Sequence, residues 1–211
     1  MHTEIEAKFL DIDAYLLREK LKSFKARLVN DERTMKRKNF DFEDSRLQKI
    51  NGWVRVRDEG NKVTLSYKQL NDRSLHGTKE VNVTVLDFKE TCNFLEIIGM
   101  KQKSYQVTKR ESWLLDEVEI EIDTWPWIPQ FVELEGKSEE ELKSVASKLG
   151  LDWKKALHGS VEIAYQVYFD VTEDEIDAWE EITFVQIPDW LEGKRIKQST
   201  KLDLKDLVNC H

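Results

Sequence analysis

Hydrophobic and polar residues alternate along several short segments of the chain. In segment 3–10, Glu4, Glu6 and Lys8 share one side, while Ile5, Ala7 and Phe9 share the other. Because successive side chains of a strand point to opposite faces, this alternation predicts a β-strand. The same period returns in segments 35–42, Trp53 to Asp58, Lys62 to Gln69, Lys79 to Val85, 105–115, Glu117 to Asp123 and Gln130 to Gly136. Together these segments predict about eight strands.

Between these predicted strands, apolar residues recur at the spacing of a helix. This spacing predicts a helix over residues 12–27, a second from Asp87 to about Ile98, and a third from a Ser138-x-x-Glu141 capping box to Gly150. Each predicted helix carries an apolar stripe that must be covered by another element. The mixture of antiparallel strands and covering helices indicates an α+β fold.

The chain of 211 residues is long enough for one large domain, or for one domain with an appendage. Three prolines and eight glycines leave no linker or low-complexity tract. We place the main domain at residues 1–170 and a C-terminal extension at 171–211, where Thr172-x-x-Glu175 predicts a short capped helix. The extension is expected to pack back onto the main domain, with a loose end over 194–211.

Charged residues gather on one face of the predicted strands, and the opposite faces are apolar. The charged positions are Glu4, Glu6, Lys8, Arg55, Arg57, Lys62, Lys68, Glu80, Arg110, Glu121, Asp123, Glu133 and Glu135. For one strand alone, a solvated outer face explains this pattern. For all the strands together, the apolar faces should turn outward to the helices, so that the charges line the interior. We therefore predict a closed eight-stranded antiparallel β-barrel with a charged lumen, covered by helices outside.

Buried charges in such a lumen must be paired or must hold ligands. Glu4 with Glu6, and Glu133 with Glu135, each bring two carboxylates to one face of a strand. Hard oxygen ligands of this kind suit Mg²⁺ or Mn²⁺, and the lack of histidine and cysteine ligands disfavours zinc.

The basic residues of the same faces point to a phosphate ligand. Arg55 and Arg57 project together and offer forked donors that match phosphate oxygens, and Lys8, Lys68 and Arg110 add positive charge. A polyphosphate is the natural ligand of this set.

Overall charge and the remaining composition exclude several classes of protein. A net charge of −8 argues against binding to a nucleic-acid polymer. Cys92 and Cys210 lack the spacing of a disulfide scaffold or zinc site, and Cys92 is expected to be buried. The sequence shows no signal-peptide pattern and no long apolar run, so we expect a cytoplasmic protein without a membrane partner.

Several short motifs resemble those of one known family, the CYTH superfamily of triphosphate tunnel metalloenzymes. Glu4-Ile5-Glu6-Ala7-Lys8 resembles its ExExK signature. The later blocks follow in the family's order: Val54-Arg55-Val56-Arg57, Thr64-Leu65-Ser66-Tyr67-Lys68, Lys79-Glu80-Val81, Lys109-Arg110-Glu111-Ser112-Trp113, Glu121-Ile122-Asp123 and Phe131-Val132-Glu133-Leu134-Glu135-Gly136. The resemblance covers residues 3 to about 168.

The resemblance implies a closed eight-stranded tunnel with a divalent-metal site, and it implies roles for individual residues. One metal would be held by Glu4, Glu6 and Glu135, and a second would be bound with help from Asp123 and Glu133. The phosphates would be gripped by Lys8, Arg55, Arg57, Lys68 and Arg110. Glu80 would either balance charge or assist catalysis, and the residues closest to the chemistry would be Glu6, Lys8 and Glu133.

Other residues have two interpretations each. Trp125 or Trp127, in a Trp-Pro-Trp connection that departs from the family pattern, could stack on a base or form a hydrophobic lid. Lys154 and Lys155 could supply the lysine that relatives place near their C-terminal helix, or could be solvated. His76 and His158 each lie beside a turn glycine and are interpreted mainly as loop residues.

The family includes inorganic triphosphatases, thiamine triphosphatases and class IV adenylyl cyclases, so the implied ligand is tripolyphosphate, ATP or thiamine triphosphate, bound by a monomer or homodimer. The first hypothesis is metal-dependent hydrolysis of a phosphoanhydride. The alternatives are a class IV adenylyl cyclase, which makes cyclic AMP and pyrophosphate, and a non-catalytic polyphosphate or nucleotide binding module. A generic barrel with a solvated polar face remains the fourth interpretation.

Overall fold

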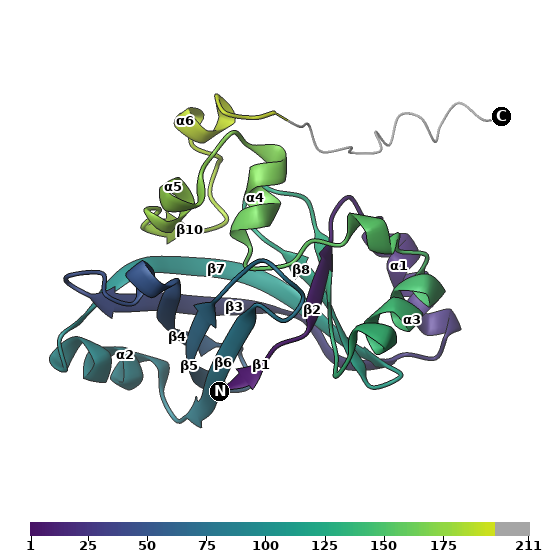
Figure 1. Ribbon diagram of the computed structural model, residues 1–211, viewed down its shortest axis with the longest axis horizontal. Helices are drawn as coiled ribbons and strands as arrows, with labels where there is room; N and C mark the ends of the chain where they lie inside the picture. Colours follow the sequence, from purple (N-terminus) through teal and green to yellow (C-terminus); the bar gives the residue numbers. More distant parts are fainter. Residues whose placement is uncertain (197–211) are drawn as a thin grey trace.

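The computed structural model describes residues 1–196 (Figure 1). Of the loose end predicted over 194–211, residues 194–196 are therefore described, and their backbone is hydrogen-bonded to Tyr168, Asp170 and Glu192. The rest of that segment lies outside the described residues. The strands are β1 (His2–Thr3), β2 (Glu6–Phe9), β3 (Arg27–Phe42), β4 (Gly52–Asp58), β5 (Val63–Leu70), β6 (Thr78–Val85), β7 (Met100–Leu115), β8 (Val118–Thr124), β9 (Phe131–Glu135) and β10 (Glu181–Ile182). The helices are α1 (Ala14–Ser23), α2 (Phe88–Ile97), α3 (Glu139–Leu149), α4 (Glu162–Tyr168), α5 (Glu173–Asp177) and α6 (Asp189–Glu192), with short 3₁₀ turns η1 (Gln48–Ile50) and η2 (Trp153–Lys155).

Nine of these strands form one curled antiparallel sheet in the order β1-β6-β5-β4-β3-β7-β8-β9-β2. The tenth, β10, runs parallel to β7 beside this path. Long β3 and β7 form its centre, and all other strands extend from this pair. The predicted α+β class is confirmed.

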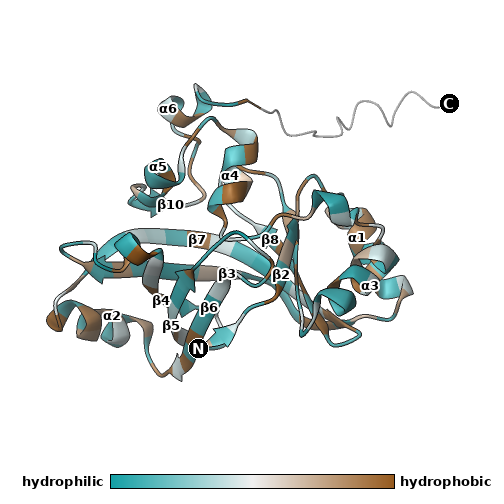
Figure 2. Ribbon diagram, viewed as in Figure 1, coloured by the Kyte–Doolittle hydropathy of each residue, from teal (hydrophilic) through white to brown (hydrophobic). Residues whose placement is uncertain are grey.

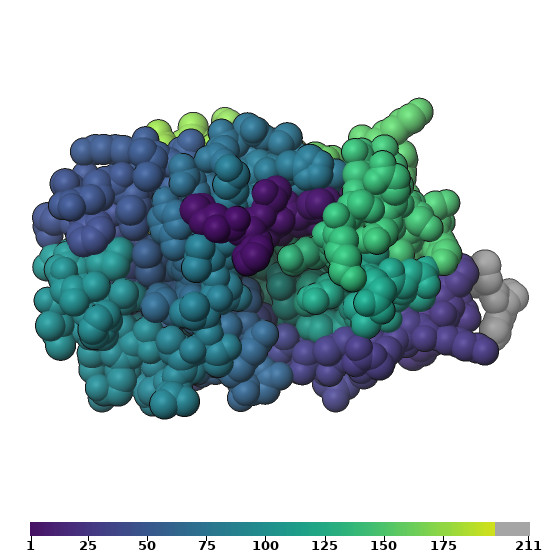
Figure 3. Space-filling view, turned by 60° about the horizontal axis from the view of Figure 1, so that its bottom comes forward, coloured from purple at the N-terminus to yellow at the C-terminus, as the bar shows by residue number. Residues whose placement is uncertain are grey.

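The N-terminal segment reaches both ends of this strand order. β1 pairs with β6, and β2 pairs with β9. Between the two strands, the amide of Glu4 donates to the carbonyl of Thr78 at 3.0 Å, and the amide of Gly136 donates to the carbonyl of Ile5 at 3.1 Å. Figure 3 shows these first residues in purple, lying between the two ends of the sheet, with the surface hollowed beside them.

Helices cover the outer face of the sheet, as the apolar stripes predicted. Leu17 and Leu21 of α1 and the apolar side of α3 pack on Ala7, Ile120 and other outward residues of β2, β7, β8 and β9. α2 packs on Phe40 of β3 and on Val56 of β4, using Cys92 and Leu95, so the predicted burial of Cys92 is confirmed. Figure 2 shows the alternation of hydrophobic and hydrophilic residues along the strands that makes this two-sided packing possible.

Helices α4 to α6 and β10 form a third layer over the sheet, opposite α2 in Figure 1. Its core joins Trp125 and Phe131 of the main domain to Ile176, Trp179 and Leu191 of the extension. The described residues after 170 thus pack on Trp125 and Phe131 through this shared apolar core. No helix within residues 1–196 is long and apolar enough to cross a membrane.

Local signals explain where the helices begin. The side chains of Asp13, Asp87 and Ser138 each accept a hydrogen bond from the amide three residues later, which satisfies one free donor of the first turn. Thr172 and Glu175 form a complete capping box at α5, as predicted. At α3, the box is half formed, because the Glu141 carboxylate accepts from the amide of Lys137 rather than from that of Ser138.

Several predicted boundaries were wrong. The helix predicted over 12–27 ends at Ser23, because Lys25 takes a positive φ of 57° and the chain then enters β3. β3 begins eight residues before the predicted 35, since its irregular register with β7 between Leu28 and Arg33 hides the two-residue period. The first predicted strand is divided at Glu4-Ile5. The outer faces are not apolar throughout either, because buried Glu111 lies there.

A candidate active site in a charged cavity

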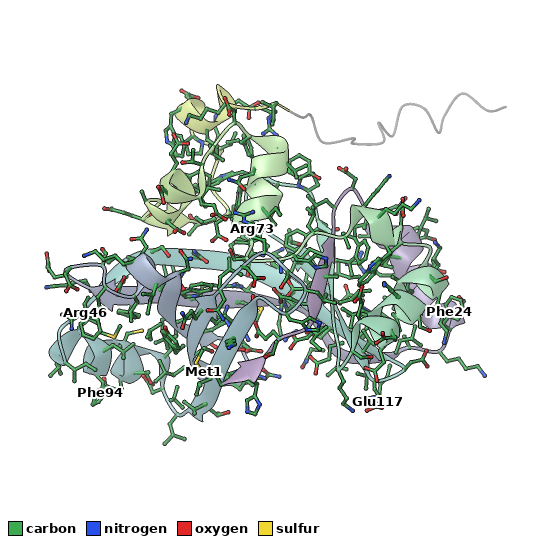
Figure 4. The ribbon with its side chains drawn as sticks, viewed as in Figure 1. Met1, Phe24, Arg46, Arg73, Phe94 and Glu117 are labelled. Atoms are coloured by element: carbon green, nitrogen blue, oxygen red, sulfur yellow. The ribbon has the colours of Figure 1, made fainter. Side chains whose placement is uncertain are left out.

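The inner face of the sheet lines a cavity of about 770 Å³. Its walls contain every predicted site residue: Glu4, Glu6, Lys8, Arg55, Arg57, Lys68, Glu80, Arg110, Asp123, Glu133 and Glu135. Strand register explains the gathering, since Lys8 pairs with Glu133, Glu133 with Glu121, and Arg110 with Asp123 across neighbouring strands. Figure 4 shows how densely side chains fill the space above the sheet, where Arg73 of the β5–β6 loop meets the third layer.

One end of this wall is built around Lys8. The Lys8 ammonium donates to Glu6 at 2.8 Å and lies 3.7 Å from Glu133, and all three residues are buried. Burial disfavours the charged lysine, but Glu133 and Glu6 outweigh it and raise the pKa of Lys8. Burial and the neighbouring Glu133 raise the pKa of Glu6 to about 8. Glu6 and Glu133 are hydrogen-bonded to each other, so one proton is shared between two carboxylates that a single lysine cannot fully neutralise.

Glu4 of the N-terminal segment and Glu80 of β6 form a second carboxylate pair. The Lys68 ammonium contacts both oxygens of Glu4 at 2.8 Å and lies 3.8 Å from Glu80. Burial and a hydrogen bond with Glu80 raise the pKa of Glu4 to about 7. Glu80 also lies 3.4 Å from Arg55, so it contacts two cations, as expected for a residue that balances charge.

Arg110 is the most completely paired cation of the cavity. Its Nε and Nη2 atoms donate to the two oxygens of Asp123 at 2.7 and 2.6 Å. Glu133 and Glu121 lie 3.6 and 3.8 Å away. Asp123 is 1% exposed, so the carboxylate of this pair is held away from solvent. Glu121 in turn accepts a hydrogen bond from the hydroxyl of Ser112 at 2.6 Å.

Arg37 of β3 lines the cavity, although the sequence did not identify it as a site residue. It is 4% exposed, yet no carboxylate within residues 1–196 forms an ion pair with it. Its Nη2 donates to the hydroxyl of Thr108 at 2.7 Å, its guanidinium lies over Trp125, and its Nε has no partner. Burial and the repulsion of Arg55 lower the pKa of Arg37 well below its usual value. A buried cation in this state calls for an anion.

Arg55 and Arg57 differ in how far they are satisfied. Arg55 has a buried Nε without a partner, and burial together with Arg57 lowers its pKa to about 10. Arg57 donates from Nε and Nη2 to one oxygen of Glu59 at 3.0 and 2.6 Å. Arg33, whose Nε also lacks a partner, lies 3.6 Å from the other oxygen of Glu59.

Arg33, Arg37 and Glu59 are charged residues of the cavity that the sequence patterns did not identify as site residues. Arg37 pairs directly with Arg57 in the register between β3 and β4. That neighbour could have identified Arg37, because its position on the inner face follows from the period of segment 35–42. Arg33 precedes the predicted strand, and Glu59 lies in a turn, so no period placed either of them on the inner face.

The tryptophans of the Trp-Pro-Trp connection have different surroundings. Trp125 lines the cavity and packs edge-on against Tyr165, besides its contact with Arg37. Trp127 packs against Trp179 of the extension, and its ring nitrogen donates to the carbonyl of Val185. Trp127 is therefore part of the hydrophobic layer between the main domain and the extension, and only Trp125 faces the cavity.

The remaining candidates lie outside the cavity wall. Lys154 and Lys155 are exposed in η2, and His76 is exposed in the β5–β6 loop. His158 is half-buried and its Nδ1 lies 3.2 Å from the carbonyl of Glu6, so it contacts β2 from behind.

The acidic residues fit a divalent metal in chemical kind. All the predicted ligands are carboxylates, which are the hard oxygen donors that Mg²⁺ and Mn²⁺ prefer. In both carboxylate pairs, burial and the neighbouring carboxylate raise a pKa, and a cation bound between the two groups would relieve that repulsion. Within residues 1–196, however, no three acidic, histidine or cysteine side chains lie close enough to hold a metal as they stand, since Lys8 and Lys68 occupy their oxygens.

Comparison with known proteins agrees with this arrangement. The CYTH domain matches residues 2–160 of the chain. Among solved structures, a conserved hypothetical protein from Pyrococcus furiosus is 23% identical, with a TM-score of 0.61, over 73% of this chain and 94% of its own. No curated protein sequence was found to match.

Two further solved structures share the fold. A candidate adenylate cyclase from Vibrio parahaemolyticus has a TM-score of 0.68 at 13% identity, over 78% of this chain and 98% of its own. A candidate adenylyl cyclase from Hippeastrum, described as having a dominant triphosphatase activity, has a TM-score of 0.55 at 13% identity, over 78% of this chain and 94% of its own. At these identities, the likeness concerns the fold alone.

Proposed function

Since this chain belongs to the CYTH domain family, we propose that it is a metal-dependent triphosphatase. It binds a triphosphate-containing small molecule in the cavity and hydrolyses a phosphoanhydride bond. The observation that carries this proposal is Arg37, a deeply buried guanidinium that has no carboxylate partner among the described residues and faces a cavity shared with paired carboxylates. An arginine in this position is a prepared site for phosphate oxygens.

The proposal includes a closed tunnel. With β1 and β2 taken as one interrupted strand, the sheet has eight strands, and its two ends are bonded to the same N-terminal segment. Closure in this way would turn the charged inner face into the lumen predicted from the sequence.

In the bound state, Arg37 and Arg55 would donate from their free Nε atoms to phosphate oxygens. Arg57, Arg110, Lys8 and Lys68 would add positive charge around the chain of phosphates. These donors lie on strands rather than loops, so their positions are fixed before the substrate binds. They need to move little when charge develops on the phosphate oxygens during the reaction.

The residues that would hold the metal are Glu4, Glu6 and Glu135, with Asp123 and Glu133 placed to help bind a second ion. When bound, Mg²⁺ or Mn²⁺ would neutralise phosphate oxygens and lower the pKa of a water. Glu6 must give up its shared proton before it can act as a ligand, and Lys8 must turn from Glu6 toward the substrate. The carboxylate pairs and their lysines are therefore the parts of the cavity expected to rearrange.

We favour hydrolysis over cyclisation because phosphate and cation sites dominate the cavity wall, while Trp125 is already covered by Arg37 and Tyr165. The described triphosphatase activity of the Hippeastrum protein supports the same choice. We also propose residues 1–170 as the catalytic domain and 171–211 as a C-terminal extension, of which the described part covers one side of the cavity. Ile176 and Asp177 of α5 line the cavity and support that assignment.

The test is product analysis. The purified protein is incubated with Mg²⁺ or Mn²⁺ and, separately, with tripolyphosphate, ATP and thiamine triphosphate, and the products are resolved by chromatography. Orthophosphate is the expected product, and the relative rates rank the substrates. Cyclic AMP with pyrophosphate would establish a cyclase instead, and unchanged substrate in every reaction would contradict an enzymatic role.

A further inference from the structure

The arginines of the cavity fall into two kinds, according to whether a protein carboxylate already occupies the guanidinium fork. In Arg110 and Arg57, the Nε and Nη2 atoms both donate to a carboxylate, Asp123 in the first case and Glu59 in the second. In Arg37 and Arg55, Nε has no partner. The Nε of Arg33 is also without a partner, although the Nη2 atom of this arginine lies 3.6 Å from Glu59.

The carboxylate that occupies the guanidinium fork of Arg57 belongs to Glu59, whose position in the chain is unusual for a buried residue. Glu59 lies in the tight turn after β4, where its amide donates to the carbonyl of Lys62 at 2.9 Å. Side chains of such turns normally point into solvent. Glu59 is instead 3% exposed and faces back into the cavity.

Glu59 is also outnumbered by cations. Arg57 contacts one of its oxygens, and Arg33 and Lys62 lie 3.6 and 3.7 Å from the other. Burial disfavours the ionised carboxyl, but Arg57 and Lys62 outweigh burial and lower the pKa of Glu59. Without this one carboxylate, three cations at the turn would form a second anion site that continues the open one.

We propose that Glu59 is a specificity-determining residue that limits the phosphate chain to the length of a triphosphate. The inference rests on the proposed function and adds a substrate limit to it. The carboxylate occupies the fork of Arg57 and places negative charge where the next phosphate of a longer chain would lie. Longer linear polyphosphates are therefore rejected by repulsion from the Glu59 carboxylate, which also keeps the fork of Arg57 occupied.

The test compares chain lengths in Glu59→Gln, which keeps the shape of the side chain and removes its charge. The measured quantity is the ratio of kcat/KM for tetrapolyphosphate and longer linear polyphosphates to kcat/KM for tripolyphosphate. We expect this ratio to rise about tenfold in the variant, as for the loss of one close like-charge contact. Equilibrium binding of the same compounds should shift in the same direction.

Glu111→Gln is the matched control. Glu111 is also a buried carboxylate that holds an arginine, since Arg18 contacts it from Nε at 2.8 Å and from Nη2 at 2.7 Å, but it lies on the outer face of the sheet. Its substitution should lower stability and leave the chain-length ratio unchanged. Lys62→Glu, at a half-exposed position of the same turn, tests the charge in the opposite sense and should lower the ratio.

The outcomes separate the two proposals. An unchanged ratio in Glu59→Gln and Lys62→Glu, with wild-type hydrolysis of tripolyphosphate intact, would overturn the role of Glu59 alone. An equal loss for every chain length in Glu59→Gln would also overturn it, because Glu59 would then only position Arg57. A wild-type protein that neither binds nor hydrolyses tripolyphosphate would overturn the proposed function and this inference with it.

Discussion

Two walls of the same cavity differ in whether their buried cations have carboxylate partners. On the acidic wall, formed by β2, β7, β8 and β9, Lys8 and Arg110 are engaged by Glu6 and Asp123 at 2.6 to 2.8 Å. On the basic wall, formed by β3 and β4, Arg37 and Arg55 keep unpartnered Nε atoms. A paired buried charge contributes to the integrity of the fold, whereas an unpaired one is a cost that a ligand can relieve. The comparison therefore separates positions that maintain structure from positions that await substrate.

The largest expected effect is on catalysis, from Glu6→Gln. Because burial and the neighbouring Glu133 raise the pKa of Glu6, glutamine should replace it at little cost in stability. It cannot become an anionic metal ligand, so metal-dependent turnover should fall by at least about a thousandfold. Steady-state rates across Mg²⁺ and Mn²⁺ concentrations measure this. Wild-type turnover in the variant would remove Glu6 from the metal site.

The next effect sharpens the contrast between the walls. Arg37→Met removes a buried charge that lacks a carboxylate partner, so the melting temperature should stay the same or rise, while kcat/KM falls about 10²- to 10³-fold, as for the loss of one fixed donor. Arg18→Met, on the outer face of the sheet, is the control variant. It removes the cation that pairs with buried Glu111, so it should destabilise the protein and leave kcat/KM unaltered. Loss of stability in Arg37→Met would mean that the basic wall is as paired as the acidic one.

A third effect concerns stability on the acidic wall. Asp123→Asn leaves the guanidinium of Arg110, half-buried in the cavity wall, without its forked carboxylate partner. Breaking a buried pair in this way should cost about 3 kcal/mol of unfolding free energy. Urea unfolding followed by circular dichroism measures it. A free-energy change near zero would show that Glu121 and Glu133 replace Asp123 as partners.

The smallest effect is a pH dependence of the metal-free protein. Burial raises the pKa of Glu4 to about 7 and of Glu6 to about 8, so the folded state holds protons that the unfolded chain has already released. Stability from these groups is full below about pH 4.5 and is lost as pH rises to about 8. Melting temperatures in a chelator should decline over that interval, and less so in Glu6→Gln. A flat profile in wild type would contradict the shared protons.

Much of this arrangement was predictable from the sequence, because two-residue alternation depends on local geometry alone. Lys8, Arg55, Asp123 and Glu133 were each placed correctly on the inner face, since each lies in a regular strand beside apolar neighbours. The period fails where the backbone is irregular. The register shifts before Arg33 and the turn that contains Glu59 both bring charges inward without any repeating pattern.

The ion-pair partners of the charged residues were harder to predict than their positions on the inner face. Arg55 and Arg57 lie two residues apart, and the sequence predicts the same phosphate-binding role for both. In the structure only Arg57 has its guanidinium fork occupied, because Glu59 folds back from the turn. The carboxylates predicted as metal ligands are likewise engaged by Lys8 and Lys68 in the structure. Which of several like charges stays unpaired depends on tertiary contacts that spacing along the chain does not encode.

The most direct test of the account is a calorimetric titration of tripolyphosphate into the wild-type protein, with and without Mg²⁺, repeated with Arg37→Met. The account predicts binding that Mg²⁺ strengthens in the wild type and that is weakened at least about a hundredfold in the variant, with no loss of melting temperature. Equal affinity in wild type and variant would contradict it, because the unpaired guanidinium of the basic wall would then not be the phosphate site.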